Sequence, residues 1–275
     1  MELAADLGSG TSDPRPQAPS LIARATAALP EGLSRPIIRC DSSFFDAKVA
    51  FAALANNADF AIVAKRNPAT WRACREIPED SWQKAKDMEA EVAECDYLPS
   101  SWPKGTRCVV RRVRVDRGEL KADPRSRRRR TIDPNQLVLL EEGEIGFAYA
   151  YSFILTNLDW SIIEIESWFR MRALVEERIK DAKWGAALRH LPSGYESVNR
   201  TWMWCALLAC NISVWLGCAH HPEDLELPGI GWWAQGRQRR QDADLRRASV
   251  GSNPRFRSAR MLATRGLRRP RPART

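Results

Sequence analysis

The hydrophobic positions near the start of the chain follow a strand, helix, strand order. Residues 36–41 (PIIRCD) predict a short buried strand that ends on an acidic residue, and residues 59–65 (DFAIVAK) predict a second one. Between them, residues 46–57 carry apolar side chains at helical spacing after Asp46, a residue type that caps helices. Two strands joined by one helix over so short a stretch favour parallel pairing, so the pattern predicts an α/β fold.

The middle of the chain predicts mainly strands. Residues 106–115 are β-branched and alternate with arginines, which predicts a strand with one basic face. Apolar runs at 137–140 and 147–156 predict two more strands. The run from Arg127 to Arg130 predicts an exposed hairpin tip or loop.

Two helices are predicted further along. Residues 161–183 give the clearest pattern, because Ser161 and Glu164 have the spacing of a capping box and apolar residues recur every three or four positions. Residues 202–219 are apolar almost throughout, which allows a membrane span as one interpretation. That stretch is short for a span and carries Asn211 in its middle, so a helix buried in a large core is favoured.

Charge is unevenly distributed along the 275 residues. The chain has 43 Lys and Arg against 34 Asp and Glu, a net charge of +9, and 44% hydrophobic residues exclude a wholly disordered protein. Residues 222–275 hold 13 Arg, no Lys and five acidic residues, so eight of the nine excess charges lie there. This tail is interpreted as disordered or as the product of a shifted reading frame, with a basic DNA-contacting extension as the alternative.

The seven cysteines predict a reducing compartment. Their number is odd, no C-x-x-C occurs, and the first residues lack the apolar core of a signal peptide. A zinc site can be drawn from cysteines and histidines near the end of the apolar helix, namely Cys205, Cys210, Cys218, His220 and His221. Their spacing matches no common zinc pattern, so cysteines that simply pack are the favoured interpretation.

Four residues of the 161–183 segment form a motif: Phe169-x2-Arg172-x3-Glu176-x6-Lys183. At about 100° per residue, all four would share one narrow face of a continuous helix. An ordinary charged helix with an Arg172–Glu176 pair is the alternative explanation, and spacing alone favours it.

Several motifs in order resemble the DDE transposases of bacterial insertion sequences (transposase DDE domain group 1, RNase H-like superfamily). The motif above is similar to that group's Tyr-x2-Arg-x3-Glu-x6-Lys signature, with Phe169 in the tyrosine position. Residues 39–45 (RCDSSFF) resemble the strand end that bears the second catalytic aspartate. Residues 102–112 (WPKGTRCVVRR) resemble part of the family's insertion, and the similarity runs from about residue 8 to about residue 221.

The resemblance implies an incomplete RNase H-like fold with a β-rich insertion between the last core strand and the catalytic helix. Residues 1–67 would be the C-terminal part of the RNase H-like sheet, and residues 68–160 the insertion. Residues 161–221 would be the catalytic and closing helices, followed by the tail at 222–275.

The resemblance also implies a chemistry. Asp41 and Glu176 would be catalytic carboxylates that hold two Mg²⁺ (or Mn²⁺) ions for phosphodiester cleavage and strand transfer. Arg172 and Lys183 would contact DNA or shape the site.

The expected partners are the DNA of the transposon ends and of the target, and a second copy of the chain in a homodimer. Arg111 and Arg112, in the basic strand, are further candidates for DNA binding. The expected location is the cytoplasm, at the nucleoid, without a membrane association.

The family's first catalytic aspartate lies on a strand upstream of the segment matching Asp41. Asp6 and Asp13 lie in polar, Gly- and Pro-containing sequence and are not assigned that role. The favoured interpretation is an N-terminally truncated transposase that is inactive alone. The alternatives are a non-catalytic basic DNA-binding protein that uses residues 107–130 and the tail, and a membrane-anchored protein that uses residues 202–219.

Overall fold

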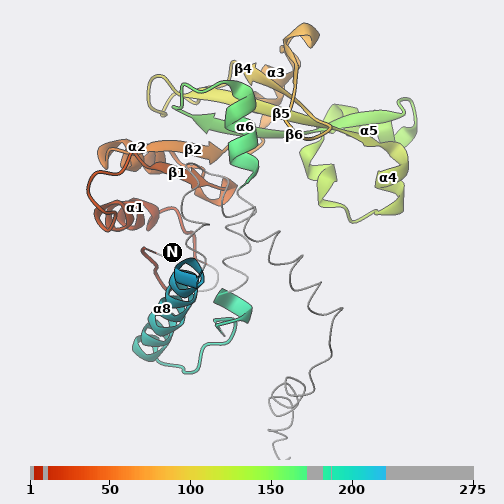
Figure 1. The fold of residues 1–275 in the computed structure, drawn as a ribbon. Coiled ribbons are helices and arrows are strands. Elements are labelled where there is room, and N and C mark those ends of the chain that lie inside the picture. Colours follow the sequence, from red (N-terminus) through yellow and green to blue (C-terminus); the bar gives the residue numbers. More distant parts are fainter. Residues whose placement is uncertain (1–2, 9–11, 172–181, 187, 221–275) are drawn as a thin grey trace, which may run out of the picture. The chain divides into compact units, whose positions relative to one another are not determined.

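A computed structural model describes residues 3–8, 12–171, 182–186 and 188–220 of the chain (Figure 1). The chain divides into two compact units, Met1–Gly217 and Cys218–Thr275. The second unit is described only at residues 218–220, so the architecture below is that of the first.

The described helices are α1 (Ala18–Ala27), α2 (Ala47–Ala55), α3 (Pro68–Arg75), α4 (Arg117–Ala122), α5 (Pro134–Glu142), α6 (Ile162–Arg170) and α8 (Glu196–His220). Short 3-10 turns occur at η1 (Ser42–Phe44), η2 (Glu79–Ser81) and η3 (Arg127–Thr131). The strands are β1 (Ile37–Cys40), β2 (Asp59–Val63), β3 (Gln83–Lys84), β4 (Glu91–Cys95), β5 (Arg107–Asp116) and β6 (Phe147–Thr156).

These six strands form one mixed sheet in the order β1-β2-β6-β5-β4-β3. β1 and β2 run parallel, with Ile38 opposite Phe60, and every other neighbouring pair is antiparallel. The predicted strand–helix–strand unit with parallel pairing is therefore confirmed. The four strands that follow it extend the same sheet, and the fold is α/β with a mostly antiparallel sheet.

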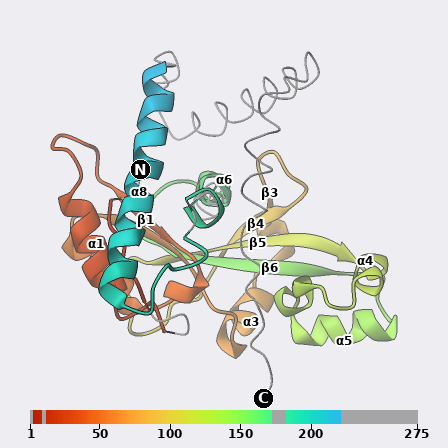
Figure 2. The same ribbon diagram turned by 90° about the horizontal axis from the view of Figure 1, so that it is seen from below.

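The centre of the sheet is buried on both faces, which explains why its strands are apolar at successive positions. In β2, Phe60 and Ile62 belong to the large core that includes residues of α2 and α3. The alternate position, Ala61, packs on the opposite face with Ile154 of β6 and Phe169 of α6. Figure 2 shows α6 and α3 on opposite sides of β5 and β6.

Local sequence signals fix where the helices begin. Asp46 caps α2 by accepting a hydrogen bond from the backbone N–H of Lys48 at 2.9 Å. Ser161 and Glu164 form the predicted capping box at the start of α6. That helix nevertheless ends at Arg170, and Met171 is its C-cap residue, with a ψ of 0°. The prediction of one uninterrupted helix over residues 161–183 is therefore wrong.

β5 and β6 form a hairpin of ten residue pairs whose connection, residues 117–146, we call the excursion. The helices α4 and α5 of the excursion and the ends of the two strands enclose a small, separate apolar cluster. Leu120, Ile132 and Leu140 are buried in it. The run from Arg127 to Arg130, predicted as an exposed hairpin tip or loop, lies in the turn η3 (Arg127–Thr131).

The run at 137–140 was predicted as a strand and is instead part of α5. Asp133 caps this helix by accepting from the backbone N–H of Asn135, and Pro134 occupies its first turn. Gly143 ends it with a φ of +93°, a conformation that favours glycine. A short apolar run cannot by itself distinguish strand from helix, and here the capping residues decide.

β5 does not have the single basic face that was predicted. Its register with β6 is continuous, so Arg107 and Arg111 lie on one face of the sheet, and Arg112 and Arg114 on the other. The adjacent arginines at 111 and 112 break the alternation on which the prediction relied.

α8 confirms the helix predicted at 202–219 but corrects its expected burial. Its apolar contacts include those of Met203 and Leu207 with Ala182 and with Leu7 near the N-terminus. Large apolar side chains of the same helix are exposed: Trp202, Trp204, Leu208, Ile212, Trp215 and Leu216. Among the residues that the structure describes, no helix is long and apolar enough to cross a membrane.

Candidate active-site region

Asp41 follows directly after β1, at the carboxyl end of the parallel strand pair. Its Oδ1 accepts a hydrogen bond from the backbone N–H of Ser43 at 2.8 Å, so Asp41 caps the turn η1. The side chain is half-buried. A carboxylate at a strand end is thus held by a local hydrogen bond while remaining partly open to solvent.

Arg39, two residues earlier, connects this strand to α6. Its Nη1 donates a hydrogen bond to the backbone carbonyl of Trp168 at 2.8 Å, and its guanidinium carbon lies 4.8 Å from the centroid of the Trp168 ring. The end of α6 therefore lies beside the carboxyl end of β1. This contact spans 129 positions in the sequence and was not foreseen from it.

Phe169, the first residue of the predicted signature, is buried against β2 and β6. Its ring packs as expected for a position where the family has tyrosine. Arg172 and Glu176 lie outside the described residues. Lys183 is exposed in a helical stretch at residues 182–184. Since α6 ends at Arg170, a shared face for all four residues does not follow from this helix.

Arg111, proposed from sequence to bind DNA, contacts α6. Its Nη1 lies 3.1 Å from Oε1 of Glu166, a side chain that is 1% exposed. Glu166 also accepts from Nε of Arg170 at 3.2 Å. Sequence reasoning missed Glu166, although its position was informative. With Ile165 and Phe169 it falls on the buried stripe of the helix, where an acid needs a cationic partner.

Arg112, the second candidate in this strand, is 5% exposed on the opposite face. It donates to both carboxylate oxygens of Glu79 at 2.7 and 2.9 Å and to Glu91 at 2.7 Å. Its guanidinium carbon lies 4.1 Å from the ring centroid of Trp82. Burial alone would lower the pKa of Arg112, but the hydrogen bonds to the two carboxylates raise it above its usual value. These contacts give Arg112 an internal, structural role.

A cavity of about 630 Å³ is lined in part by Phe45 and Asp46, the residues that follow η1. Phe45, directly after η1, stacks on Trp102 with ring centroids 5.2 Å apart. Trp102 is buried in the large core and packs there. The cavity is lined by Phe45, Asp46, Ala47, Lys48, Phe51, Asn67, Tyr97, Pro99, Ser101 and Trp102.

The chemistry of Asp41 fits a hard divalent cation, because carboxylate oxygens are the ligands that Mg²⁺ prefers. Within the described ranges, no group of three His, Cys, Asp or Glu side chains could hold a metal ion. Glu176, the predicted second ligand, lies outside those ranges. Of the zinc candidates, Cys205 is exposed and Cys210 half-buried on α8, while no side chain of Cys218, His220 or His221 is described.

Comparison with known proteins assigns the chain to a family. The family model described as transposase DDE domain group 1 matches residues 3–227. No curated protein and no solved structure matches the chain. The matched segment contains the whole sheet, Asp41, α6 and the residues up to Lys183, and it leaves most of the Arg-rich tail outside. Because the match covers well over half of the sequence, the chain belongs to the transposase DDE domain group 1 family.

Proposed function

We propose that this chain is the catalytic region of a DNA transposase, in which Asp41 and Glu176 are metal-binding carboxylates. The observation that carries the proposal is the contact of Arg39 with Trp168, which brings the strand end bearing Asp41 beside the end of α6. The segment containing Glu176 begins two residues after that helix ends. β1 and β2 would be the parallel part of an RNase H-like sheet, with residues 68–160 as the insertion.

The proposed reaction is phosphodiester cleavage followed by strand transfer. Bound Mg²⁺ or Mn²⁺ would supply activation of the attacking oxygen and stabilisation of the leaving oxygen. Asp41 and Glu176 would hold the metal, and Arg172 and Lys183 would bind DNA phosphates close to it. The capping bond from Ser43 fixes one oxygen of Asp41, which limits the rotation of the carboxylate.

We further propose that this chain does not cleave DNA by itself. β1 is the edge strand of the described sheet, so no other described strand end lies on its outer side to bring a further carboxylate next to Asp41. A DDE site in the family uses three such groups, and Asp6 and Asp13 are engaged elsewhere, in ion pairs with Arg24 and Arg15.

Metal binding at this site can be tested without an assay of DNA cleavage. Titration of the purified chain with Mn²⁺, followed by electron paramagnetic resonance of the free ion, would compare Asp41→Asn with Asp46→Asn. Both aspartates cap a turn or helix, and asparagine keeps that capping hydrogen bond while removing the charge. We expect Asp41→Asn to weaken Mn²⁺ binding at least tenfold and Asp46→Asn to leave it unchanged. Equal binding by both variants would overturn the site.

The absence of activity is tested separately. The purified chain is incubated with supercoiled plasmid DNA and Mg²⁺ or Mn²⁺, and nicked and linear products are separated on a gel. We expect no product above the protein-free control. Nicking that disappears with Asp41→Asn would overturn the inactivity and support the catalytic role of Asp41.

A non-catalytic DNA-binding protein is the second candidate, and the exposed arginines of the excursion favour it. Two results together would favour this function over the first. The DNA affinity would be unchanged by Asp41→Asn and by chelation of divalent ions, and the Asp41→Asn variant would bind Mn²⁺ as the wild type does.

A further inference from the structure

We propose that Arg125, Arg127 and Arg130, here called the arginine patch, bind the phosphate backbone of DNA. This inference rests on the proposed function for the identity of the ligand and adds the surface that contacts it. The patch lies on the excursion, around the turn η3 that follows Ser126.

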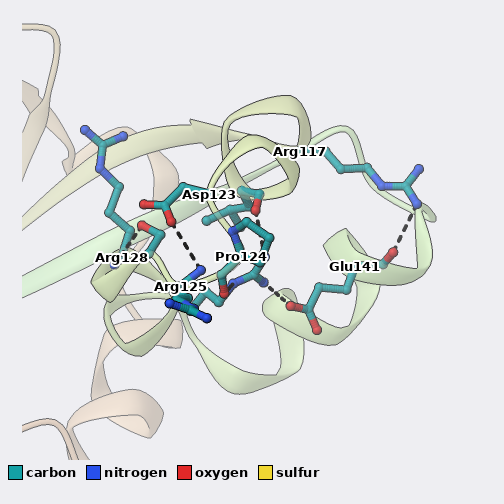
Figure 3. Close-up of polar contacts among 9 residues, drawn as sticks. Arg117, Asp123, Pro124, Arg125, Arg128 and Glu141 are labelled. Atoms are coloured by element: carbon teal, nitrogen blue, oxygen red, sulfur yellow. Dashed lines mark hydrogen bonds and ion pairs between the residues drawn. The ribbon is translucent and has the colours of Figure 1, made fainter.

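The arginines of this turn divide into two groups by their contacts. Arg128 pairs with Glu119 at 2.6 Å. Arg129 pairs with Glu141 and also donates to the backbone carbonyl of Leu120 at 2.7 Å. These two side chains therefore connect η3 to α4 and α5 and hold the excursion together. Figure 3 shows Arg117 beside Glu141, whose backbone carbonyl accepts a hydrogen bond from Nη2 of Arg117 at 3.0 Å.

The patch residues make no comparable contacts. Arg125, Arg127 and Arg130 are exposed, and within the described chain their guanidinium groups have no hydrogen-bond or ion-pair partner. The backbone N–H of Arg125 donates to Asp123 at 3.2 Å (Figure 3), and Arg127 and Arg130 belong to the 3-10 helix η3. Three permanent positive charges are thus presented to solvent within six residues.

Buried contacts hold the residues directly after η3 in place. Asp133, which is 3% exposed, binds Arg75 of α3 through both carboxylate oxygens at 2.6 and 2.7 Å and caps α5. Ile132, directly after η3, bridges to Ala150 of β6. The patch is therefore attached both to the sheet and to α3, and its arginines have a fixed base.

Exposed like charges within six residues repel one another, and a bound anion would relieve that repulsion. The guanidinium group forms two parallel hydrogen bonds with a phosphate, and a nucleic-acid backbone offers many phosphates in sequence. Arg112 illustrates the contrast, because its donors are used by Glu79 and Glu91 inside the protein. The charge that is free to attract DNA in this region lies on the excursion and not on Arg112 of β5.

The test compares two triple variants of the full chain that lose the same formal charge. Arg125→Gln/Arg127→Gln/Arg130→Gln removes the patch. Lys65→Gln/Arg72→Gln/Lys104→Gln removes three exposed cations elsewhere whose side chains likewise form no hydrogen bond or ion pair with the described residues. Binding to a fluorescein-labelled 30-base-pair duplex is measured by anisotropy over a range of NaCl concentrations. Urea unfolding midpoints verify that both variants fold.

We expect the patch variant to bind at least tenfold more weakly at moderate salt. The slope of log affinity against log salt should fall by about 2.7, or roughly 0.9 for each lost phosphate contact. The control should stay within twofold of the wild type. The single variants Arg127→Gln and Arg130→Gln should each lower the slope by about 0.9, which keeps the test valid if the triple variant is unstable.

Three outcomes would overturn the inference in distinguishable ways. If the wild type does not bind the duplex, both the inference and the proposed function fail. If the wild type binds and the patch variant matches the control in affinity and slope, the inference fails while the proposed function stands. Patch-dependent binding to vesicles with anionic lipid but not to DNA would likewise replace DNA by a membrane surface as the ligand.

Discussion

Arg111 and Arg112 are neighbours on β5 whose guanidinium groups lie on opposite faces of the sheet, each bound to carboxylates from other elements. Arg111 contacts Glu166 of α6, and Arg112 contacts Glu79 and Glu91. Side chains of β5 therefore bind α6 on one face of the sheet, and η2 and the neighbouring strand β4 on the other. Both arginines act within the fold, and their loss should be seen first in stability.

Replacement of Glu166 by Gln should destabilise the protein. Glu166 is buried and pairs with Arg111 and Arg170, so the substitution leaves two arginines close together without their shared anion. We expect a loss of about 2–3 kcal/mol in the free energy of unfolding, less than for a fully buried pair because both arginines are partly exposed. Urea denaturation followed by tryptophan fluorescence measures it. Glu94→Gln is the matched control, since the Glu94 side chain is half exposed whereas Glu166 is buried, and its pair with Arg107 should contribute about 1 kcal/mol or less.

Arg112→Ala should cost about 3 kcal/mol, because it removes three charge-assisted hydrogen bonds and the packing of the guanidinium on Trp82. Arg112→Lys should recover only part of this, since an ammonium group cannot reproduce the forked contacts. Arg114, which is 61% exposed on the same face, provides the comparison, and Arg114→Ala should cost about 0.5 kcal/mol or less. Equal unfolding midpoints for the two alanine variants would contradict the assigned role of Arg112.

Acid should weaken the fold through the carboxylates bound to arginine. A side-chain hydrogen bond from Arg112 lowers the pKa of Glu79, and one from Arg107 lowers the pKa of Glu94. A carboxyl group whose folded pKa is lowered contributes stability that is fully present above the unfolded value of about 4.3 and is lost as pH falls through the folded value. Unfolding free energies measured from pH 6 to pH 3 should therefore decrease.

The same series in Arg112→Gln should decrease less steeply, because the pKa of Glu79 then returns toward its ordinary value. The difference in stability between the wild type and this variant should shrink with acid. A constant difference from pH 6 to pH 3 would show that the Arg112–Glu79 pair does not contribute to the pH dependence.

Thiol reactivity should distinguish buried from exposed cysteines. Burial raises the pKa of Cys74 to about 12, so almost none of it is thiolate at pH 8. Cys205 is exposed on α8. We expect iodoacetamide at pH 8 to modify Cys205 in the native protein and Cys74 only after addition of urea, as located by peptide mass spectrometry. Equal native rates at the two sites would mean that the core around Cys74 opens readily.

The sequence predicted the elements whose signals are local. The parallel strand pair, the capping box at Ser161 and the strand at 147–156 all follow from residues within a few positions of each other. Helix α5 was predicted as a strand because its four consecutive apolar residues were given more weight than its ends. Asp133 and Pro134 at its start and Gly143 at its end are residue types that begin and end helices.

The contacts that organise the candidate site could not be predicted in the same way. Arg39 and Trp168, or Arg112 and Glu79, are brought together by the topology of the sheet, and no spacing rule links them. The resemblance of residues 39–45 to a family motif predicted Asp41 as a site residue, but its neighbours follow only from the fold. The burial of α8 was overestimated because apolar composition says nothing about which contacts a helix finds.

β6 pairs with its two neighbouring strands over unequal lengths. That strand pairs with β5 over ten residues, but with β2 only through Ile154, Leu155 and Thr156. The hydroxyl of Thr156 also donates to the carbonyl of Phe60, which is 96 positions away in the sequence. Because closing so long a loop costs entropy before any contact repays it, the β5–β6 hairpin should form early in folding and the junction with β2 late. β1, which Asp41 follows, therefore joins the rest of the sheet through β2 and these three residue pairs. We expect this junction to be the last part of the sheet to form.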